Sequence, residues 1–227
     1  MKICIFSDIH GNYPAFCRML EAEGDASYFL FAGDIFGYFY GQEKIMGQMI
    51  RMRNLFAVKG NHDYQFLCCA QQKQELADQY GSSYYTTLPG PQAAYLDSLP
   101  EYLEFELAGK RFGMFHGGME DPLNQRIYPD SSINADLAAD KYDYLVVGHT
   151  HYRFLRKENG MTIINPGSLG QPRDGLGFGY CVLNPCDDTC EFKNVYVNIE
   201  DLLSEVKRKD PHRKICNYLC EKYGGNP

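Results

Sequence analysis

The sequence predicts an α/β protein of one domain whose functional site lies at the junction of two β-sheets. Short apolar strands alternate with helical stretches in the first 80 residues, whereas residues 102–197 are rich in strands. Polar residues of the kind that bind metals follow strands in both parts. No linker, low-complexity tract or internal repeat separates the parts, so we expect residues 1–227 to form a single domain, with residues 199–227 as a helical C-terminal extension.

The first part predicts three strand–turn–helix units. An apolar, β-rich run at residues 2–7 predicts a strand buried on both faces, and residues 12–23 have apolar side chains at helical spacing. In α/β sheets, ligands bind beyond the carboxyl ends of the strands, where this chain places its polar residues. The further strands are expected at Tyr28–Phe31 and Leu55–Lys59, and the further helices at Glu43–Arg53 and after Asp63 to about Tyr80.

The second part predicts a β-rich layer with mostly antiparallel strands. Gly, Pro, Ser and Thr at residues 81–90 indicate a loop, and a short helix over 92–99 is stopped by Pro100. The tail predicts two helices broken at Asp210-Pro211, which we interpret as a helical cap rather than a dedicated partner surface. The expected strands are Tyr102–Leu107, Arg111–Phe115, Tyr144–Val147, Phe154–Lys157, Met161–Ile164, Tyr180–Leu183 and Glu191–Val197.

Composition limits the classes of function. The formal net charge of −7 argues against a broad nucleic-acid-binding surface, and no apolar run is long enough to cross a membrane. We expect a cytoplasmic protein, with a homo-oligomer left open, because the nine cysteines are scattered and follow no secretory pattern. A structural zinc site at the pairs Cys186/Cys190 and Cys216/Cys220 is the less favoured alternative to buried apolar packing.

Five of the six histidines lie in four short motifs, together with aspartate and asparagine. The neutral imidazole binds borderline metals well, so this clustering predicts a site for two metal ions. With Gly33-Asp34, the motifs Asp8-Ile9-His10, Gly60-Asn61-His62-Asp63, His116-Gly117 and Gly148-His149-Thr150-His151 supply seven candidate ligands: Asp8, His10, Asp34, Asn61, His116, His149 and His151.

The spacing within the motifs suggests how the ligands divide. Residues i and i+2 of an extended segment point the same way, so Asp8 and His10 can bind one cation together, as can His149 and His151. Asp34 is the natural bridge, because its two carboxylate oxygens can bind different ions. Two metals roughly 3.5–4 Å apart can hold a hydroxide between them and clamp phosphoryl oxygens during an in-line displacement, which predicts phosphate-ester hydrolysis.

These motifs resemble the calcineurin-like metallophosphoesterase superfamily. The stretches at residues 33–38 and 165–174 resemble its small bacterial and archaeal phosphodiesterase branch, and the likeness covers residues 1–197. It implies a four-layer α/β/β/α sandwich of two mixed sheets and two divalent ions, of which manganese is favoured over iron, zinc or nickel. It assigns one ion to Asp8, His10, Asp34 and His151, and the other to Asp34, Asn61, His116 and His149.

The resemblance also implies a phosphodiesterase that attacks small soluble phosphate esters with a metal-bridging hydroxide. His62 would stabilise the transition state or protonate the leaving oxygen, with a cap for the following helix as its structural alternative. Arg173 could reach a substrate phosphate, although an ion pair with Asp174 is an equal alternative. A phosphomonoesterase, a dinucleoside polyphosphate hydrolase of the same superfamily and a non-catalytic scaffold are the alternative functions.

Overall fold

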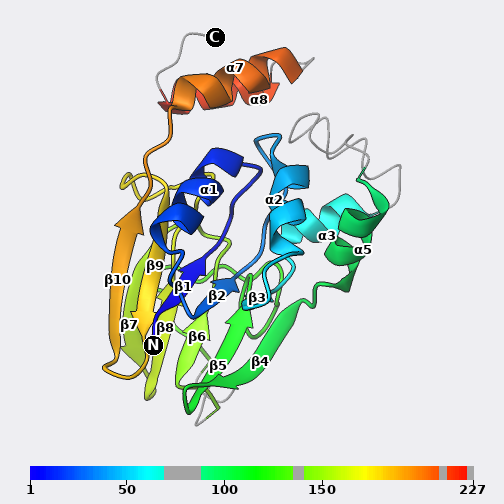
Figure 1. Cartoon of the computed structure of the whole chain (residues 1–227). Helices are drawn as coiled ribbons and strands as arrows, with labels where there is room; N and C mark the ends of the chain where they lie inside the picture. The colour runs from blue at the N-terminus through cyan, green and yellow to red at the C-terminus, as the bar shows by residue number, and fades with distance from the viewer. Residues whose placement is uncertain (69–87, 135–140, 210–213, 224–227) are drawn as a thin grey trace.

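Two five-stranded mixed β-sheets pack face to face, and helices cover the outer face of the first sheet (Figure 1). The structure is a computed structural model and describes residues 1–68, 88–134, 141–209 and 214–223. The first sheet has the strand order β10-β9-β1-β2-β3, and the second has the order β4-β5-β6-β8-β7. The predicted sandwich of two mixed sheets is therefore confirmed.

The first sheet combines strands from both ends of the chain. β1 pairs in parallel with β2 on one side and antiparallel with β9 on the other, so its apolar side chains are buried on both faces. The sequence-based assignment of the last two strands to a separate layer is wrong, because β1 needs a second neighbour and β9 supplies it. The strands are β1 (Ile3–Phe6), β2 (Tyr28–Phe31), β3 (Leu55–Ala57), β9 (Gly179–Asn184) and β10 (Thr189–Asn194).

The second sheet has a parallel centre and antiparallel edges. β6 pairs in parallel with β5 and β8, whereas β4 and β7 form antiparallel hairpins with β5 and β8. The expectation of mostly antiparallel strands therefore fails at the centre of this sheet, from which β6 sends its C-terminal end toward the ligand motifs. The strands are β4 (Tyr102–Leu107), β5 (Lys110–Phe115), β6 (Tyr144–Val146), β7 (Phe154–Glu158) and β8 (Met161–Asn165).

The helices begin close to their predicted positions, but the second ends at Met49 instead of Arg53, and the third ends at Leu67, where Cys68 has extended backbone. The Asn12 side chain accepts a hydrogen bond from the amide of Ala15 and caps the first helix. Of the helical stretch expected to about Tyr80, the part over 69–80 lies outside the described residues. The helices are α1 (Tyr13–Ala22), α2 (Gln42–Met49), α3 (Asn61–Leu67), α5 (Gly90–Ser98), α7 (Ile199–Lys209) and α8 (Lys214–Tyr223).

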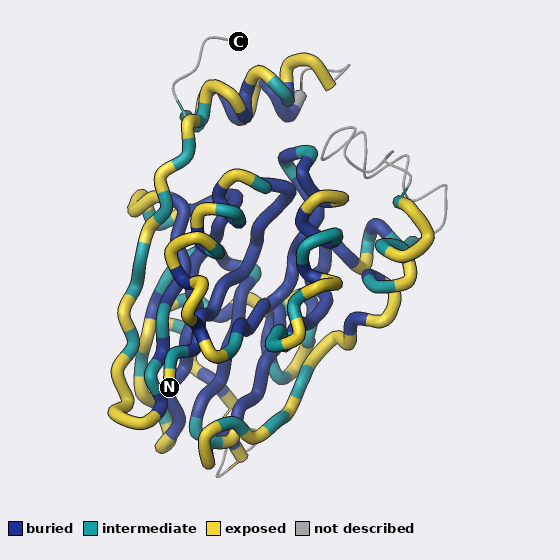
Figure 2. The backbone as a smooth tube through the Cα atoms, viewed as in Figure 1, coloured by how far each residue is buried: buried dark blue, intermediate teal, exposed yellow. Residues whose placement is uncertain are grey.

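The core lies in two main layers on either side of the first sheet, whose central strands β9, β1 and β2 are buried along most of their length, unlike the edge strands β10 and β3 (Figure 2). Ile3 and Ile5 face the second sheet and pack in one cluster with Phe112 and Tyr144. Phe6 faces the helices and packs 5.9 Å from Phe16, measured between ring centroids. This burial on both sides fixes the strands that carry the ligand motifs at their ends.

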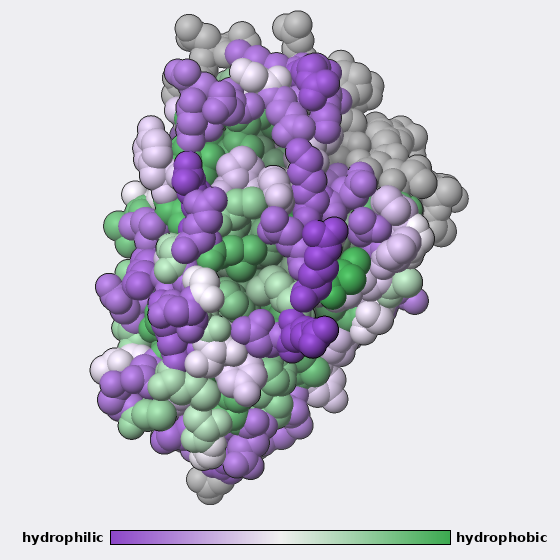
Figure 3. Space-filling model, viewed as in Figure 1, coloured by the Kyte–Doolittle hydropathy of each residue, from purple (hydrophilic) through white to green (hydrophobic). Residues whose placement is uncertain are grey.

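Helices α7 and α8 lie across the end of the sandwich toward which β1 and β2 run (Figure 1). Their apolar faces form a small cluster that includes Phe39. Cys216 and Cys220 are buried in that cluster, as expected for an apolar helix face. Outside this contact, α1, α2 and α7 present a mostly hydrophilic surface with apolar residues in the hollows between them (Figure 3). No helix in the described ranges is long and apolar enough to span a bilayer.

Candidate metal centre

The fold brings all seven predicted ligands to one end of the two sheets. Asp8 follows β1, Asp34 follows β2, and Asn61 opens α3 after β3. From the second sheet, His116 follows β5, and the motif with His149 and His151 follows β6. All seven are buried except His149, which is partly exposed. The carboxyl ends of β1, β2, β3, β5 and β6 therefore meet at a common polar centre inside an apolar sandwich.

Three of the histidine rings are held by main-chain carbonyl groups. The Nδ1 atoms of His10, His116 and His151 lie 2.6, 2.8 and 2.6 Å from the carbonyl oxygens of Phe36, Ala32 and Gln171. A proton on Nδ1 satisfies each carbonyl and leaves Nε2 as the ring atom that can bind a metal ion. Metal-binding histidines show this arrangement, in which the outer hydrogen bond fixes the tautomer and orients the ring.

The two aspartates each use one oxygen within the protein and leave the other free. Asp8 Oδ2 accepts a hydrogen bond from the amide of His149 (3.1 Å), and Asp34 Oδ1 accepts one from the amide of His62 (2.8 Å). Asp8 Oδ1 and Asp34 Oδ2 are buried and accept no hydrogen bond from the described residues. A buried carboxylate oxygen without a donor is costly, so these two atoms indicate a site for a cation.

The free atoms form two overlapping groups. In the first, Asp8 Oδ1 lies 3.1 Å from His151 Nε2 and 3.8 Å from His10 Nε2. In the second, His116 Nε2 lies 2.9 Å from Asn61 Oδ1 and 3.3 Å from Asp34 Oδ2.

Asp34 Oδ2 also lies 3.9 Å from His10 Nε2, so this oxygen stands between the groups as a bridging ligand would. With metal–ligand bonds of about 2.1 Å, neighbouring donor atoms are expected roughly 3–3.5 Å apart, so the donor set fits divalent cations. His149 stands at the edge of the second group, with its ring centroid 5.0 Å from that of His116.

Left-handed backbone is concentrated at the ligands. Positive φ angles occur at five of the seven, which corrects the expectation that each i, i+2 pair lies in an extended segment. Side chains rarely adopt this conformation, which costs about 1–3 kcal/mol per residue and is typical of functional sites. The angles are 52° at Asp8, 48° at His10, 68° at Asp34, 65° at His149 and 62° at His151.

Burial and charge set the protonation of the site. Burial lowers the pKa of His10 to about 3 and that of His149 to about 4, so both rings are neutral. Burial opposes the protonation of His116 too, but the charges of Asp34 and Asp8, together with hydrogen bonds to Asp34 and to the Ala32 carbonyl, outweigh it and raise the pKa of His116 to about 9. His116 therefore carries a proton on Nε2 in the metal-free protein, and a cation would displace that proton.

Asp63 positions the bridging ligand, a role that the motif alone did not reveal. Its carboxylate accepts hydrogen bonds from the amides of Asp34, Ile35, Phe36 and Gly60, at 2.8–3.1 Å. Burial and the nearby charge of Asp34 raise the pKa of Asp63 to about 7. One carboxylate thus ties the loop after β2 to the start of α3.

Glycines let these two loops approach each other. Gly33 has a φ of 93°, and a Cβ atom there would lie 2.8 Å from the backbone of Gly60 and from His116 Nδ1. A Cβ atom on Gly60 would lie 2.0 Å from Asp34 Oδ1. Only glycine fits at either position, which explains why both motifs begin with this residue.

Of the two other predicted site residues, His62 is buried within the ligand cluster, whereas Arg173 lies at its exposed edge. The His62 ring meets the His10 ring edge-on, with centroids 5.1 Å apart, and burial lowers its pKa. Arg173 is exposed, and its amide donates to the carbonyl oxygen of His151. The alternative ion pair with Asp174 is wrong, because the Asp174 carboxylate pairs with Arg153 at 2.6 Å.

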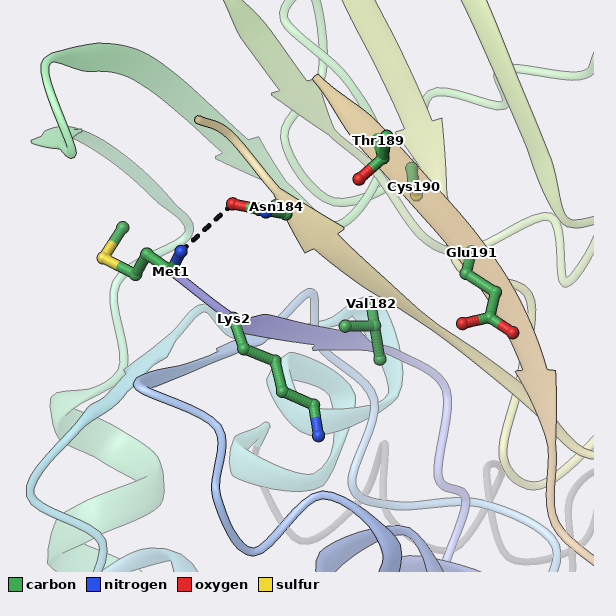
Figure 4. A pocket seen from close by; sticks show the side chains of 7 residues that line it. All are labelled: Met1, Lys2, Val182, Asn184, Thr189, Cys190 and Glu191. Atoms are coloured by element: carbon green, nitrogen blue, oxygen red, sulfur yellow. Dashed lines mark hydrogen bonds between the residues drawn. The ribbon is translucent and has the colours of Figure 1, made fainter. Parts of the chain in front are cut away.

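A second hollow lies at the opposite end of β1, beside Met1 and Lys2 (Figure 4). The Met1 ammonium donates to Asn184 Oδ1 across it, and Glu191 is the only acidic residue among those that line it. No histidine lines this hollow, so it lacks the donor set that the other end of the strand assembles. We therefore place the chemistry at the ligand cluster.

Comparison with known proteins agrees with this geometry. A family model for the calcineurin-like phosphoesterase superfamily domain matches residues 1–188. The chain is 28% identical over 244 residues to the protein MJ0912 of Methanocaldococcus jannaschii, which covers 97% of this chain and 96% of that protein. It is 26% identical over 217 residues to the phosphodiesterase YfcE of Escherichia coli K12, covering 91% and 97% of the two chains.

A solved metallophosphoesterase from Sphaerobacter thermophilus has the same fold along nearly its whole length. It superposes with a TM-score of 0.79 at 26% identity, covering 97% of this chain and 99% of the other. The family match, the shared fold and the candidate metal ligands agree. The chain belongs to the calcineurin-like phosphoesterase superfamily and is a phosphoester hydrolase.

Proposed function

We propose that this protein is a binuclear metal-dependent phosphodiesterase that hydrolyses small soluble phosphate esters in the cytoplasm. The observation that carries the proposal is the donor set at the ends of the sheets. There, one oxygen each of Asp8 and Asp34 has no hydrogen-bond donor and lies near histidine Nε2 atoms, and each of these rings is held by a hydrogen bond between its Nδ1 atom and a main-chain carbonyl group. The preference for diesters is supported by the relationship to YfcE, a phosphodiesterase. Manganese is the favoured metal, and iron, zinc and nickel are alternatives with the same mixed N and O ligands.

The seven ligands divide between two cations that share Asp34. One would be held by Asp8, His10, Asp34 and His151. Between their histidine Nε2 atoms, and from these atoms to the aspartate oxygens, the distances are 3.1–3.9 Å. The other would be held by Asp34, Asn61, His116 and His149. Cations bound there would activate water and offset the charge of the phosphoryl group, which is the chemistry that ester hydrolysis requires.

The remaining residues would bind and orient the substrate. His62 opens α3 beside the first group, where its ring can donate an N–H to a phosphoryl oxygen or a proton to the leaving oxygen. Asp63 holds the backbone that presents Asp34, so it is a positioning residue. Arg173 stands at the rim with an exposed guanidinium suited to an anionic substrate.

Metal removal and restoration test the proposal. Chelated protein should not hydrolyse bis-p-nitrophenyl phosphate, and added manganese should restore hydrolysis together with two bound ions per chain, measured by elemental analysis. Asp8→Asn should lose activity and bound metal, whereas Asp130→Asn, which changes an exposed carboxylate far from the motifs in sequence, should behave as wild type. Hydrolysis that survives chelation, or a single bound ion in fully active protein, would contradict the binuclear proposal.

A further inference from the structure

One face of helix α8 lies beside the candidate metal centre. Tyr218 and Lys222 are one helical turn apart and therefore share a face. The Tyr218 ring stacks on that of Tyr38 with centroids 5.8 Å apart, and Tyr38 in turn meets the His10 ring edge-on at 5.1 Å. Lys222 Nζ donates a hydrogen bond of 2.7 Å to Gln171 Oε1. Since Gln171 also supplies the carbonyl that holds His151, α8 approaches the first ligand group at two points.

The buried face of α8 adjoins these two residues and holds the helix in place. Ile215 and Leu219 are buried in one cluster with Leu203 of α7 and with Phe39 from the loop after β2. The position of Lys222 is therefore set by packing as well as by its own hydrogen bond. The family model ends at residue 188, so this helix lies outside the part that defines the superfamily.

The polar side chains around Gln171 are hydrogen-bond donors, and no acidic residue within the described ranges pairs with them. Lys222 has three N–H donors and forms no ion pair within the described ranges. The Arg173 guanidinium has no hydrogen-bond or ion-pair partner there, and Gln171 Nε2 is buried without an acceptor in the same part of the chain. Gln171, which accepts the hydrogen bond from Lys222, lies two residues before Arg173, so both cations lie at the loop between β8 and β9. Burial, followed by the charge of Arg173, lowers the pKa of Lys222 to about 8.

We propose that Lys222 and Arg173 bind a second anionic group of the substrate, beyond the phosphate that is cleaved. Two neighbouring cations repel each other. A bound anion would offset that repulsion and accept hydrogen bonds from the N–H groups of both side chains. The inference rests on the proposed function and narrows its substrate class. The preferred esters carry another phosphate on the same molecule, and α8 provides the selectivity.

Direct binding tests this preference without requiring hydrolysis. Titration calorimetry on the manganese-loaded full chain would compare adenosine 5′-monophosphate with adenosine 3′,5′-bisphosphate, which differ only by the second phosphate. We expect wild type to bind the bisphosphate about tenfold more tightly, the size of one charge-assisted hydrogen bond. Lys222→Met, which keeps the aliphatic stem, should reduce that ratio to near one, and Lys222→Arg should retain most of it.

Lys209→Met is the matched control on the same pair of helices. Lys209 pairs with Glu205 and lies over the Tyr40 ring, so its removal should leave the binding ratio unchanged. A wild-type ratio near one, or a ratio that survives Lys222→Met, would overturn the inference. Equal weakening of both ligands with a lower melting temperature would also overturn it, because Lys222 would then only clamp α8 to Gln171.

The two proposals fail in different ways. Metal-loaded protein that prefers the bisphosphate but cleaves neither bis-p-nitrophenyl phosphate nor related diesters would refute the proposed function and leave the anion site standing. Protein that cleaves diesters but shows no preference would refute only the inference about Lys222.

Discussion

Both ends of the sandwich contain residues with left-handed backbone, but the two ends hold that conformation differently. One end, which we call the turn end, contains exposed hairpin turns, and the other, the ligand end, contains the seven predicted ligands. At the turn end, the φ angles are 50–58° at Ala108, Asn159 and Asp188. At the ligand end, the five left-handed residues lie in loops fixed by contacts with distant parts of the chain, such as the bond from the His149 amide to Asp8. Local sequence is sufficient at the first end, whereas the second depends on the assembled fold.

Glycines show the same contrast. Gly109 and Gly160 follow two of the exposed turn residues, and a Cβ atom on either would meet nothing within 4 Å. Gly33 and Gly60 at the ligand end have no such room, because each faces the other's loop at less than 3 Å. We infer that changes at the ligand end disturb both stability and function, while equivalent changes at the turn end affect little.

The largest effect is expected from Asp34→Asn. This change removes the charge that both ligand groups share while keeping the size of the side chain. Hydrolysis of bis-p-nitrophenyl phosphate should fall by about 10³-fold or more, because the lost interaction stabilises both ions and the transition state. Metal content should fall in parallel. Near-normal activity in this variant would show that the two groups do not work as one centre.

His62→Ala tests whether the seven predicted ligands form the complete metal site without His62. His62 lies at the same end, but it begins α3 with ordinary helical backbone. Turnover should fall by roughly 10²-fold, as for loss of a general acid, while bound metal stays near two ions per chain. If His62→Ala empties the site, the ring is itself a ligand, as its proximity to His10 and Asp34 also allows.

Gly33→Ala and Gly160→Ala compare the same change at the two ends. Both glycines have left-handed φ angles, of 93° and 77°, so both variants carry a backbone cost. Gly160→Ala should cost about 1 kcal/mol of unfolding free energy and leave activity intact, since the added methyl group enters open space.

Gly33→Ala should cost about 3 kcal/mol or more, because the methyl group also collides with backbone. Urea unfolding curves with paired activity assays would measure the difference. Equal costs at the two positions would remove the distinction between the ends.

The last prediction concerns the exchange of a proton at His116 and needs no substitution. Its pKa is raised to about 9, so the proton on Nε2 is present at neutral pH and must leave when a cation binds. Manganese affinity should rise about tenfold per pH unit between pH 6 and 8, with roughly one proton released per chain. In the metal-free protein, the same proton contributes stability that is complete below about pH 6.5 and is lost as the pH rises through 9.

Calorimetry at pH 7 in buffers of different ionisation enthalpy would count the released protons. Affinity that does not change with pH would mean that His116 is already neutral. We expect no comparable proton release at the turn end, where the left-handed residue Asp188 forms an ion pair with Lys157 on the surface.

Sequence reasoning identified what is encoded locally. The motifs place each ligand at the end of an apolar strand, and the structure brings all seven together there. It could not foresee that β9 joins the first sheet, because strand order depends on pairing between distant segments. The left-handed backbone at His10 and His151 was equally hidden, because it depends on long-range contacts that form only in the folded protein.

The same limit applies to residues that act through contacts. Asp63 was visible in its motif, but its four amide partners come from two loops that only the fold brings together. Lys222 carries no motif, and its approach to Gln171 depends on how α8 packs. Apolar spacing at Leu202, Leu203 and Val206 predicted a helix with one buried face, and could not show which face of the protein it covers.

The Asp63 carboxylate and the carbonyl groups behind the histidines have one more consequence. They hold the donor atoms through protein hydrogen bonds, so the cage has its shape before any ion enters it. A set of mixed N and O donors held in this way accepts several divalent ions, and raw affinity alone would not favour manganese, because affinity rises along the series from manganese to copper. We therefore expect the occupant to be decided by which transition metal the cell keeps abundant, and one chain to work with different metals as that supply changes.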